Sequence, residues 1–429
     1  MLKKVLIITY FFPPRPIVAS LRFEGLAKYL PEYNWEPTIL TAKLPSPHDP
    51  RYNVIETRDS DILIEWKERL GLSPDKTFRD QLGQTVKKDT YMDYLLHAAK
   101  EVMAYPDYNK KWYGYAVPVA RELLKKEKFD AIISSSGPST AHLIAHTLKK
   151  EFGIPWIADF RDLWTQYHNY SYSGVRKFFE TNLEVRTLAN ADAIITVSHP
   201  LAEKLHHLHH VPVYVVPNGF DPELLNQTST ISSKFSINYT GRIYRGKMDP
   251  EPFFKVVRNL MNENRIDPSD LEIHFWGCAE TWIQNLIDEY NLNHVIFLHN
   301  AVPRAQVLEI QRRSQLLLLF IWNDPNEEGI VTGKIYEYLA ARRPIFAIGP
   351  FGGAIPKLLK ETNAGWIAGN EQNIATAMMQ HYQQFKSQQI VSYNGDYSII
   401  SRYSHREMAR GFAILLNKIT KNEKNPNPN

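Results

Sequence analysis

The sequence has little of what marks secreted, membrane-spanning or nucleic-acid-binding proteins. Its 429 residues include one cysteine, Cys278, so no disulfide can form within the chain and no oxidising compartment is required. The longest purely apolar stretches, such as Leu316–Trp322, are far shorter than the roughly 18 residues that indicate a membrane span. The formal net charge is only +4, which is too small to argue for nucleic acid but is compatible with anionic ligands or an anionic membrane surface.

What is present is an ordinary globular composition. Hydrophobic residues make up 44% of the chain and charged residues 22%, which excludes disordered, collagen-like and coiled-coil classes. At roughly 100–200 residues per domain, the length predicts two or three domains. Aromatic residues make up 12%, and their flat faces suit sugar stacking as well as cores.

The start of the chain has two interpretations. Lys3 and Lys4 precede the apolar run Val5–Phe12, which superficially resembles a signal peptide. The run is short and ends at Pro13 and Pro14, so the preferred interpretation is a buried parallel strand that enters a loop. We therefore expect a cytoplasmic protein, with peripheral contact to the cytoplasmic face of the membrane left open.

Strand and helix patterns alternate along the chain and predict an α/β fold. We expect an N-terminal Rossmann-like domain at 1–210, with a mostly helical insertion at about 44–115, and a second at 211–400. A C-terminal helix at 401–420 and a disordered tail at 421–429 complete the prediction. Both domains should be doubly wound, should face a central cleft and should bind ligands beyond the carboxyl ends of their strands.

A basic loop follows the strand predicted at Phe235–Thr240. Gly241 lets the backbone approach a ligand closely, while Arg242 and Lys247 could clamp a diphosphate. The alternative is a solvated basic loop, which is the commoner fate of surface Arg and Lys.

A second segment, 327–340, combines a turn with the start of a helix. The turn contains Gly329, Thr332, Gly333 and Lys334, and a helix N-terminus there would offer an anion site. Glu337 lies one turn further on and could accept two hydrogen bonds from vicinal hydroxyls, as on a ribose. The alternative is an i,i+3 ion pair between Lys334 and Glu337.

Together with several other segments, these two motifs make the chain resemble retaining GT-B glycosyltransferases of the group-1, family 4-like type over about residues 3–420. The resemblance is carried by the loops and strand ends at 10–14, 156–164, 215–221, 241–247 and 334–340. It implies a nucleotide-sugar donor on the C-terminal domain and an acceptor on the N-terminal domain.

The resemblance also implies residue roles. Arg242 and Lys247 would contact the donor diphosphate, Glu337 the ribose, and backbone at His299–Val302 the base. The sequence departs from the family pattern at two places. Gly329 occupies the place of the family's first glutamate, so either a one-residue shift lets Glu328 reach the sugar or that contact is missing. The family's Gly-Gly is also absent from the first loop.

On the acceptor side, Asp159, Arg161 and Asp162 follow a predicted strand at 156–159. Either carboxylate could orient an acceptor hydroxyl, or an internal Asp–Arg pair could brace the loop. His142, early in the helix predicted at Ser139–Phe152, is a catalytic candidate together with Arg242, Lys247 and Glu328; the alternative for it is a packed core histidine.

We expect no metal and no required cofactor, because no Asp-x-Asp suggests a metal-bound diphosphate and because His206 and His210, although at i,i+4 spacing, have no evident third ligand. Lysine pairs near 87 and 110 could rest on an anionic bilayer or could simply be solvated.

The predicted function is transfer of a sugar from a UDP- or GDP-sugar to a hydroxyl of a saccharide or lipid-linked saccharide, in cell-surface polysaccharide or glycolipid synthesis. Alternatives are a GT-B-fold nucleotide-sugar epimerase or phosphorylase, and a catalytically silent saccharide- or nucleotide-binding protein.

Overall fold

The computed structural model describes residues 2–15, 18–58, 101–167, 170–324 and 329–422. Several predictions lie outside these residues: much of the helical insertion expected at about 44–115, the lysine pair near 87, Glu328 and most of the expected tail. The chain divides into two compact units, Met1–Pro217 with Ala409–Asn429, and Asn218–Met408.

The N-terminal unit is built on a seven-stranded parallel sheet in the order β3-β2-β1-β4-β5-β6-β7. Its elements are β1 (Lys3–Ile8), α1 (Val18–Tyr29), β2 (Trp35–Ala42), β3 (Asn53–Thr57), α5 (Trp112–Lys126), β4 (Ala131–Ser135), α6 (Thr140–Phe152), β5 (Trp156–Phe160), α7 (Gly174–Leu188), β6 (Ala193–Thr196), α8 (His199–Leu208) and β7 (Val213–Val215), with a short 3₁₀ helix at Leu30–Tyr33. The strand order reverses between β1 and β4, which is a topological switch point.

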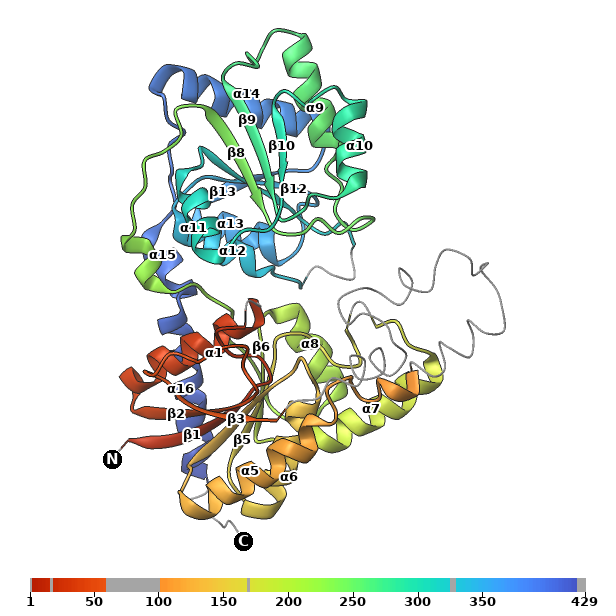
Figure 1. Ribbon diagram of the computed structural model, residues 1–429, viewed down its shortest axis with the longest axis vertical. Coiled ribbons are helices and arrows are strands. Elements are labelled where there is room, and N and C mark those ends of the chain that lie inside the picture. Colours follow the sequence, from red (N-terminus) through yellow and green to blue (C-terminus); the bar gives the residue numbers. More distant parts are fainter. Residues whose placement is uncertain (1, 16–17, 59–100, 168–169, 325–328, 423–429) are drawn as a thin grey trace. The chain divides into compact units, whose positions relative to one another are not determined.

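The C-terminal unit has a six-stranded parallel sheet in the order β10-β9-β8-β11-β12-β13. Its elements are β8 (Phe235–Thr240), α9 (Glu251–Asn262), β9 (Leu271–Trp276), α10 (Thr281–Glu289), β10 (Ile296–His299), α11 (Arg304–Arg313), β11 (Leu316–Phe320), α12 (Gly333–Ala341), β12 (Ile345–Ile348), α13 (Ala354–Thr362), β13 (Gly365–Ala368), α14 (Glu371–Gln388) and α15 (Tyr397–Ile400), with 3₁₀ turns at Pro222–Asn226 and Ser401–Tyr403 (Figure 1). The last helix, α16 (His405–Asn422), begins in this unit and continues in the N-terminal one.

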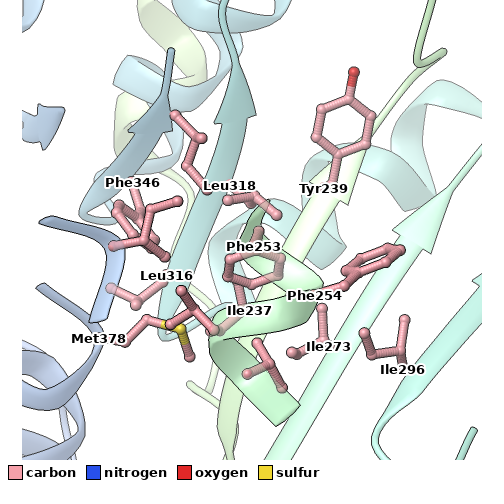
Figure 2. Close-up of a cluster of buried hydrophobic side chains, with 14 of the residues drawn as sticks. Ile237, Tyr239, Phe253, Phe254, Ile273, Ile296, Leu316, Leu318, Phe346 and Met378 are labelled. Carbon is pink, nitrogen blue, oxygen red and sulfur yellow. The ribbon is translucent and has the colours of Figure 1, made fainter. Parts of the chain in front are cut away.

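Alternate residues of the buried strands feed two apolar layers in the C-terminal unit. On one face, Ile237, Ile273 and Leu318 pack with Phe253 of α9 and Met378 of α14 (Figure 2). On the other face, residues of β11 and β12 pack with α12 and α13. Because parallel strands are buried on both sides, their sequences read as nearly continuous apolar runs.

The predicted pair of doubly wound domains is confirmed, but three strands differ from expectation. β3 lies within the stretch predicted to be a mostly helical insertion, and the sequence pattern at β13 predicts no strand. Both are edge strands with only partial burial, so their apolar pattern is weak. β7 falls within the second domain predicted at 211–400, whereas it pairs with β6 of the first sheet.

Candidate functional site

The C-terminal unit has its switch point between β8 and β11, where the strand order reverses. Gly241 directly follows β8, Ile321 directly follows β11, and the helix that leads away from this edge on the β11 side is α12. Ligands of doubly wound sheets bind at such a position. Most donor-side residues predicted from the sequence lie on these loops and on α12.

Glycines let the loops at this edge come together. A Cβ atom on Gly277 would lie 3.8 Å from the Cα atom of Gly241 and 4.0 Å from that of Ala301, so the loops after β8, β9 and β10 are in contact. Gly241 has φ +107°, and a Cβ atom there would lie 3.1 Å from Nζ of Lys334. In this structure, the group that the backbone at Gly241 approaches closely is therefore the side chain of Lys334.

Lys334 is the cation that the structure places against Gly241. Its Nζ donates a hydrogen bond of 2.6 Å to the hydroxyl of Tyr239 and lies 4.2 Å from the centre of that ring. The Tyr239 hydroxyl in turn donates to the carbonyl oxygen of Arg242 at 2.6 Å. Burial lowers the pKa of Lys334 to about 8, against an ordinary value of 10.5, because an ammonium loses hydration there.

The N-terminus of α12 adds backbone donors beside this lysine. The side chain of Thr332, at the N-cap position, makes no capping hydrogen bond within the part of the chain that the structure describes. The Thr332 hydroxyl oxygen is buried and has no hydrogen-bond partner in the described part of the chain. Uncapped N–H groups and a buried hydroxyl next to a lysine form a site suited to an anion.

Glu337 is held by side chains from α11. Its Oε1 accepts from Nε of Arg304 at 3.1 Å, and its Oε2 accepts from Nε2 of Gln311 at 3.4 Å. The same Gln311 nitrogen donates to the Thr240 hydroxyl at 3.0 Å, which ties the carboxylate to the end of β8. The ion pair of Glu337 is therefore with Arg304, and the i,i+3 pair with Lys334 considered as the alternative does not form.

The two cations predicted to clamp a diphosphate have different surroundings. Arg242 is exposed, and its guanidinium makes no hydrogen bond or ion pair with any described residue. Lys247 pairs with Asp324, whose Oδ2 lies 3.0 Å from Nζ, and lies 5.8 Å from the centre of the Trp322 ring. Contact of either residue with a donor stays a prediction.

The end of β10 carries a stack of rings. His299 lies parallel to Trp276 with ring centres 3.7 Å apart, and its Nε2 is 3.0 Å from Nδ1 of His274. Burial, followed by the neighbouring His274, lowers the pKa of His299. Val302 is partly buried in the loop that follows. Burial also lowers the pKa of His274, so both rings favour the neutral form, which suits a nucleobase better than a phosphate.

A small pocket of about 70 Å³ lies at the ends of β11 and β12. It is lined by Ile321, Trp322, Asn323, Asp324, Ile330, Pro350, Gly352, Ala354, Ile355 and Pro356. This volume is below the roughly 300–1,000 Å³ of most small-molecule pockets, so it cannot hold a nucleotide by itself. Gly329 is buried just before it along the chain.

In the N-terminal unit, Asp159 is fully buried in a bidentate ion pair. Nη2 of Arg22, on α1, lies 2.8 Å from Oδ1, and Nε lies 3.2 Å from Oδ2. Arg22 also donates to the carbonyl oxygens of Val216 and Pro217. An internal Asp–Arg pair thus forms, with Arg22 rather than Arg161 as the partner.

Arg161 is half-buried, whereas its neighbour Asp162 is exposed. Arg161 donates to the Ser135 hydroxyl at 3.2 Å and to the Ser136 carbonyl at 2.8 Å, so it joins the loops after β4 and β5. Asp162 is exposed. Of the three acceptor-side candidates, Asp162 has the carboxylate that solvent reaches; a role in acceptor binding stays a prediction for all three.

His142 lies in the core of the N-terminal unit. It is fully buried, its Nδ1 is 2.8 Å from the Ser134 hydroxyl, and its ring stacks on Phe160 at 4.6 Å. Burial, then His209 and Arg161, lower its pKa to about 3, so the ring is neutral. A substrate does not reach this ring without movement of its neighbours.

The histidines near the end of α8 do not gather. His206, His207 and His210 are exposed, while His209 is buried with its Nε2 3.2 Å from Glu184. No group of three or more metal-ligating side chains is found among the described residues. No helix in that same part of the chain is long and apolar enough to cross a membrane.

Sequence reasoning missed Tyr239, Arg304 and Arg22. Tyr239 stands in an apolar strand where a tyrosine reads as core, and Figure 2 shows its hydroxyl pointing away from the other labelled side chains. Arg304 and Arg22 contact residues that are far away in the sequence, so no local spacing of residue types predicts their roles. Lys334 was named, but only as one residue of a turn.

Comparison with known proteins gives a family match to one part of the chain and solved structures with a similar fold. A family profile described as Glycosyltransferase Family 4 matches residues 22–224. No curated protein matches the chain.

Solved structures share the architecture over nearly the whole length. Sucrose-phosphate synthase from Thermosynechococcus elongatus is 13% identical with a TM-score of 0.56, and 98% of this chain and 99% of that chain are covered. A glycosyltransferase from Rickettsia africae is 12% identical with a TM-score of 0.59, at 98% and 99% coverage. Anabaena HepE in complex with UDP and glucose is 13% identical with a TM-score of 0.59, at 97% and 100% coverage.

Proposed function

We propose that the chain is a glycosyltransferase that transfers a sugar from a nucleotide-diphosphate donor to a hydroxyl group, because residues 22–224 match the profile of glycosyltransferase family 4 and both units have the doubly wound fold of the similar structures. The donor would bind the C-terminal unit and the acceptor the N-terminal unit. The acceptor would be a saccharide or a lipid-linked saccharide, the anomeric configuration would be retained, and the product would enter a cell-surface polysaccharide or glycolipid.

The observation that carries the proposal is the anion site around Lys334. Its ammonium lies against Gly241, beside the uncapped start of α12, at the switch point of a doubly wound sheet. Such a site would hold the diphosphate, with Arg242 and Lys247 adding charge from the loop after β8. Glu337, one turn further along α12, would accept hydrogen bonds from the ribose, and the backbone at His299–Val302 would meet the base. The complex of HepE with UDP and glucose supports a uridine donor.

The mechanism follows from where charge develops. As the bond between the anomeric carbon and the diphosphate oxygen breaks, negative charge grows on that oxygen. Lys334, Arg242, Lys247 and the α12 N–H groups would stabilise it, and preorganised donors of this kind are commonly worth 10²–10³ in rate each. The acceptor oxygen forms the new bond to the anomeric carbon, and its proton passes to the departing phosphate. No metal is required in this scheme.

The test is binding followed by turnover. Isothermal titration with UDP and with GDP should give binding to one of them, and the matching nucleotide sugar should be consumed in the presence of an acceptor. Lys247→Ala should lower turnover at least tenfold. Lys255→Ala is the matched control, since Lys255 also pairs with a carboxylate, Glu371, at 2.8 Å in the same unit.

Other results would point elsewhere. Conversion of the nucleotide sugar to an isomer without acceptor would identify an epimerase. Binding without turnover under any acceptor would support a silent binding protein, and binding of neither nucleotide would refute the donor site.

A further inference from the structure

Helix α7 has the reverse of the usual amphipathic pattern. Arg176, Glu180 and Glu184, at i, i+4 and i+8, are buried, with relative exposures of 6%, 2% and 1%. Val175, Phe178 and Phe179 are exposed at 71%, 66% and 59%. A surface helix normally turns its apolar stripe inward, so this arrangement requires a reason.

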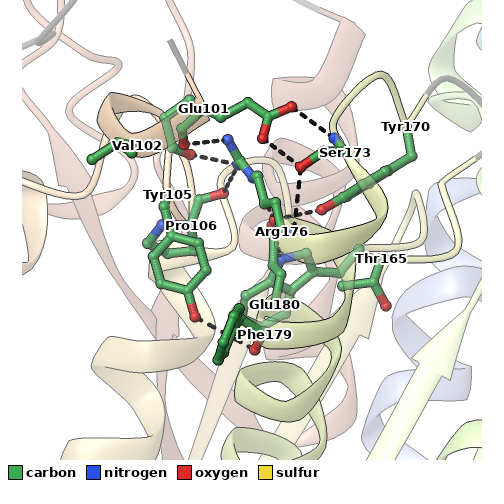
Figure 3. A network of polar contacts seen from close by, with 12 residues as sticks. Glu101, Val102, Tyr105, Pro106, Thr165, Tyr170, Ser173, Arg176, Phe179 and Glu180 are labelled. Atoms are coloured by element: carbon green, nitrogen blue, oxygen red, sulfur yellow. Dashed lines mark hydrogen bonds and ion pairs between the residues drawn. The ribbon is translucent and has the colours of Figure 1, made fainter. Parts of the chain in front are cut away.

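A network of buried polar contacts prevents the helix from rotating (Figure 3). Nε of Arg176 lies 2.9 Å from Oε2 of Glu180, and its Nη atoms donate to the carbonyl oxygens of Glu101 and Ala104 at 2.6 and 2.8 Å. Rotation of the helix to bury the phenylalanines would separate Arg176 from these partners. A buried charge without its partner is strongly unfavourable.

Glu180 and Glu184 are held from the other side of the network. Oε1 of Glu180 accepts from Nε1 of Trp164 at 2.7 Å, and its Oε2 accepts from the Tyr170 hydroxyl at 2.8 Å. Glu184 accepts from the backbone N–H of Thr165 at 3.0 Å. The outward direction of the apolar side chains is therefore fixed by the fold.

A neighbouring segment extends the apolar surface. The carboxylate of Glu101 accepts from the backbone N–H of Ser173 at 2.7 Å, and the Tyr105 hydroxyl donates to the Phe179 carbonyl at 3.5 Å. Val102, between them in the sequence, is 73% exposed. We call Val102, Val175, Phe178 and Phe179 the α7 patch.

Cations outnumber anions around the α7 patch, where the half-buried carboxylate of Glu101 accepts from Ser173. The exposed charged residues of α7 are Lys177 and Arg186, because both glutamates of the helix are buried. Lys110 brings a third cation, since its Nζ donates to the carbonyl oxygen of Val102 at 3.3 Å. Exposed phenylalanine and valine flanked by cations on a helix complement a surface that is apolar inside and anionic outside.

We propose that the α7 patch docks the N-terminal unit on a lipid bilayer rich in anionic phospholipids. The patch exposes roughly 400–500 Å², at about 150–250 Å² for each aromatic side chain. That is within the range of functional surface patches but below the roughly 800 Å² per partner of a stable protein dimer. Insertion of a few side chains into a bilayer does not require as large an area as a protein dimer does. The inference goes beyond the proposed sugar transfer, to which it adds a lipid surface where a lipid-linked acceptor would be met.

Vesicle sedimentation of the full chain tests the proposal. Wild-type protein should sediment with vesicles of phosphatidylcholine and phosphatidylglycerol, less with phosphatidylcholine alone, and less in 0.5 M salt. The double variant F178S/F179S should lower binding at least tenfold. Ile414→Ser, which removes a 55% exposed apolar residue from α16, is the matched control and should bind as wild type.

A site-specific label gives an independent readout. Cys278 is buried, so a polarity-sensitive dye on F178C reports on that position, and I414C serves as its control. Vesicles should shift the dye emission to the blue for F178C and leave I414C unchanged.

The readouts separate this proposal from others. Equal binding by wild type and F178S/F179S, or no binding of either to anionic vesicles, would overturn it. A wild-type dimer that the double variant converts to monomer, without vesicle binding, would assign the patch to a second copy of the chain. UDP titration should be unaffected by these variants, so failure of this proposal is distinct from failure of the donor site.

Discussion

At the scale of single residues, Lys334 concentrates the chemistry of the C-terminal unit. Its ammonium is partly desolvated and close to a glycine, a tyrosine hydroxyl and a helix start. A cation in such a place is unfavourable to the free protein and favourable to a bound anion. Binding sites that require a buried charge often lower the folding stability of the free protein in this way.

Lys334→Met should therefore raise the midpoint temperature of the free protein by a few degrees and weaken UDP binding at least tenfold. Methionine keeps the apolar stem and removes the buried charge. Differential scanning calorimetry and isothermal titration measure the two effects. A variant that binds UDP as wild type would remove Lys334 from the donor site.

The stability difference between wild type and Lys334→Met should depend on pH. The folded-state pKa of about 8 lies below the ordinary 10.5, so the full cost of the buried ammonium is present below pH 8. Between pH 8 and 10.5 the folded protein releases this proton while the unfolded chain keeps it, which stabilises wild type. The advantage of the variant should shrink across that window and should be constant below it.

Gly241→Ala should weaken UDP binding and lower stability by about 1 kcal/mol or more. An added Cβ atom would meet Nζ of Lys334 at 3.1 Å, and φ +107° strains any L side chain. Gly246→Ala is the control, because φ is also positive at +79° but nothing lies within 4 Å. Equal UDP affinities for the two variants would contradict the role of the close approach.

At the scale of elements, α11 and α12 together present Glu337. Arg304 begins α11 and Gln311 lies near its end, and both hold a carboxylate on α12. Two helices from different places in the sequence thus fix one side chain. The exposed ion pair itself is worth at most about 1 kcal/mol, so its value lies in orientation.

Glu337→Gln should lower affinity for UDP by roughly tenfold while hardly changing affinity for 2′,3′-dideoxy-UDP. A hydrogen bond to a charged group contributes about 1.5–3 kcal/mol, and the dideoxy ligand cannot make it. Titration of both proteins with both ligands gives the coupling. Arg304→Ala is the control, because it leaves the carboxylate in place and should keep the preference for UDP. A similar loss for both ligands would place Glu337 away from the ribose.

At the scale of the whole molecule, two units with separate cores share one chain. The chain leaves the N-terminal unit after Pro217 and returns to it within α16. Phe412 and Leu416 of α16 are fully buried, and the Arg22 guanidinium lies 5.0 Å from the centre of the Phe412 ring. The last helix therefore completes the core that begins at the first strand.

We expect two unfolding transitions in calorimetry, of which UDP raises only the one that belongs to the C-terminal unit. Phe412→Ala should lower the other transition by at least about 5 °C, because deleting a buried phenylalanine costs about 3–5 kcal/mol. A variant that lowers the UDP-sensitive transition instead would contradict this division.

The sequence predicts different amounts of the fold and of the candidate site. Apolar runs separated by helical periods predicted two doubly wound domains, and the central strands β1 and β8 were found because burial on both faces leaves continuous apolar sequence. The edge strands β3 and β13 were not, because partial exposure breaks that pattern. At the site, Gly241, Lys334 and Glu337 were named from local spacing alone.

The sequence by itself determined the class of fold and which residue types stand at the ends of the strands. The tertiary structure decided which of them meet: Lys334 against Gly241, Arg304 on Glu337, and Arg22 on Asp159. It also decided that α7 turns its charges inward and its phenylalanines outward. Local patterns follow from neighbours along the chain, whereas burial and pairing depend on segments brought together only when the sheets form.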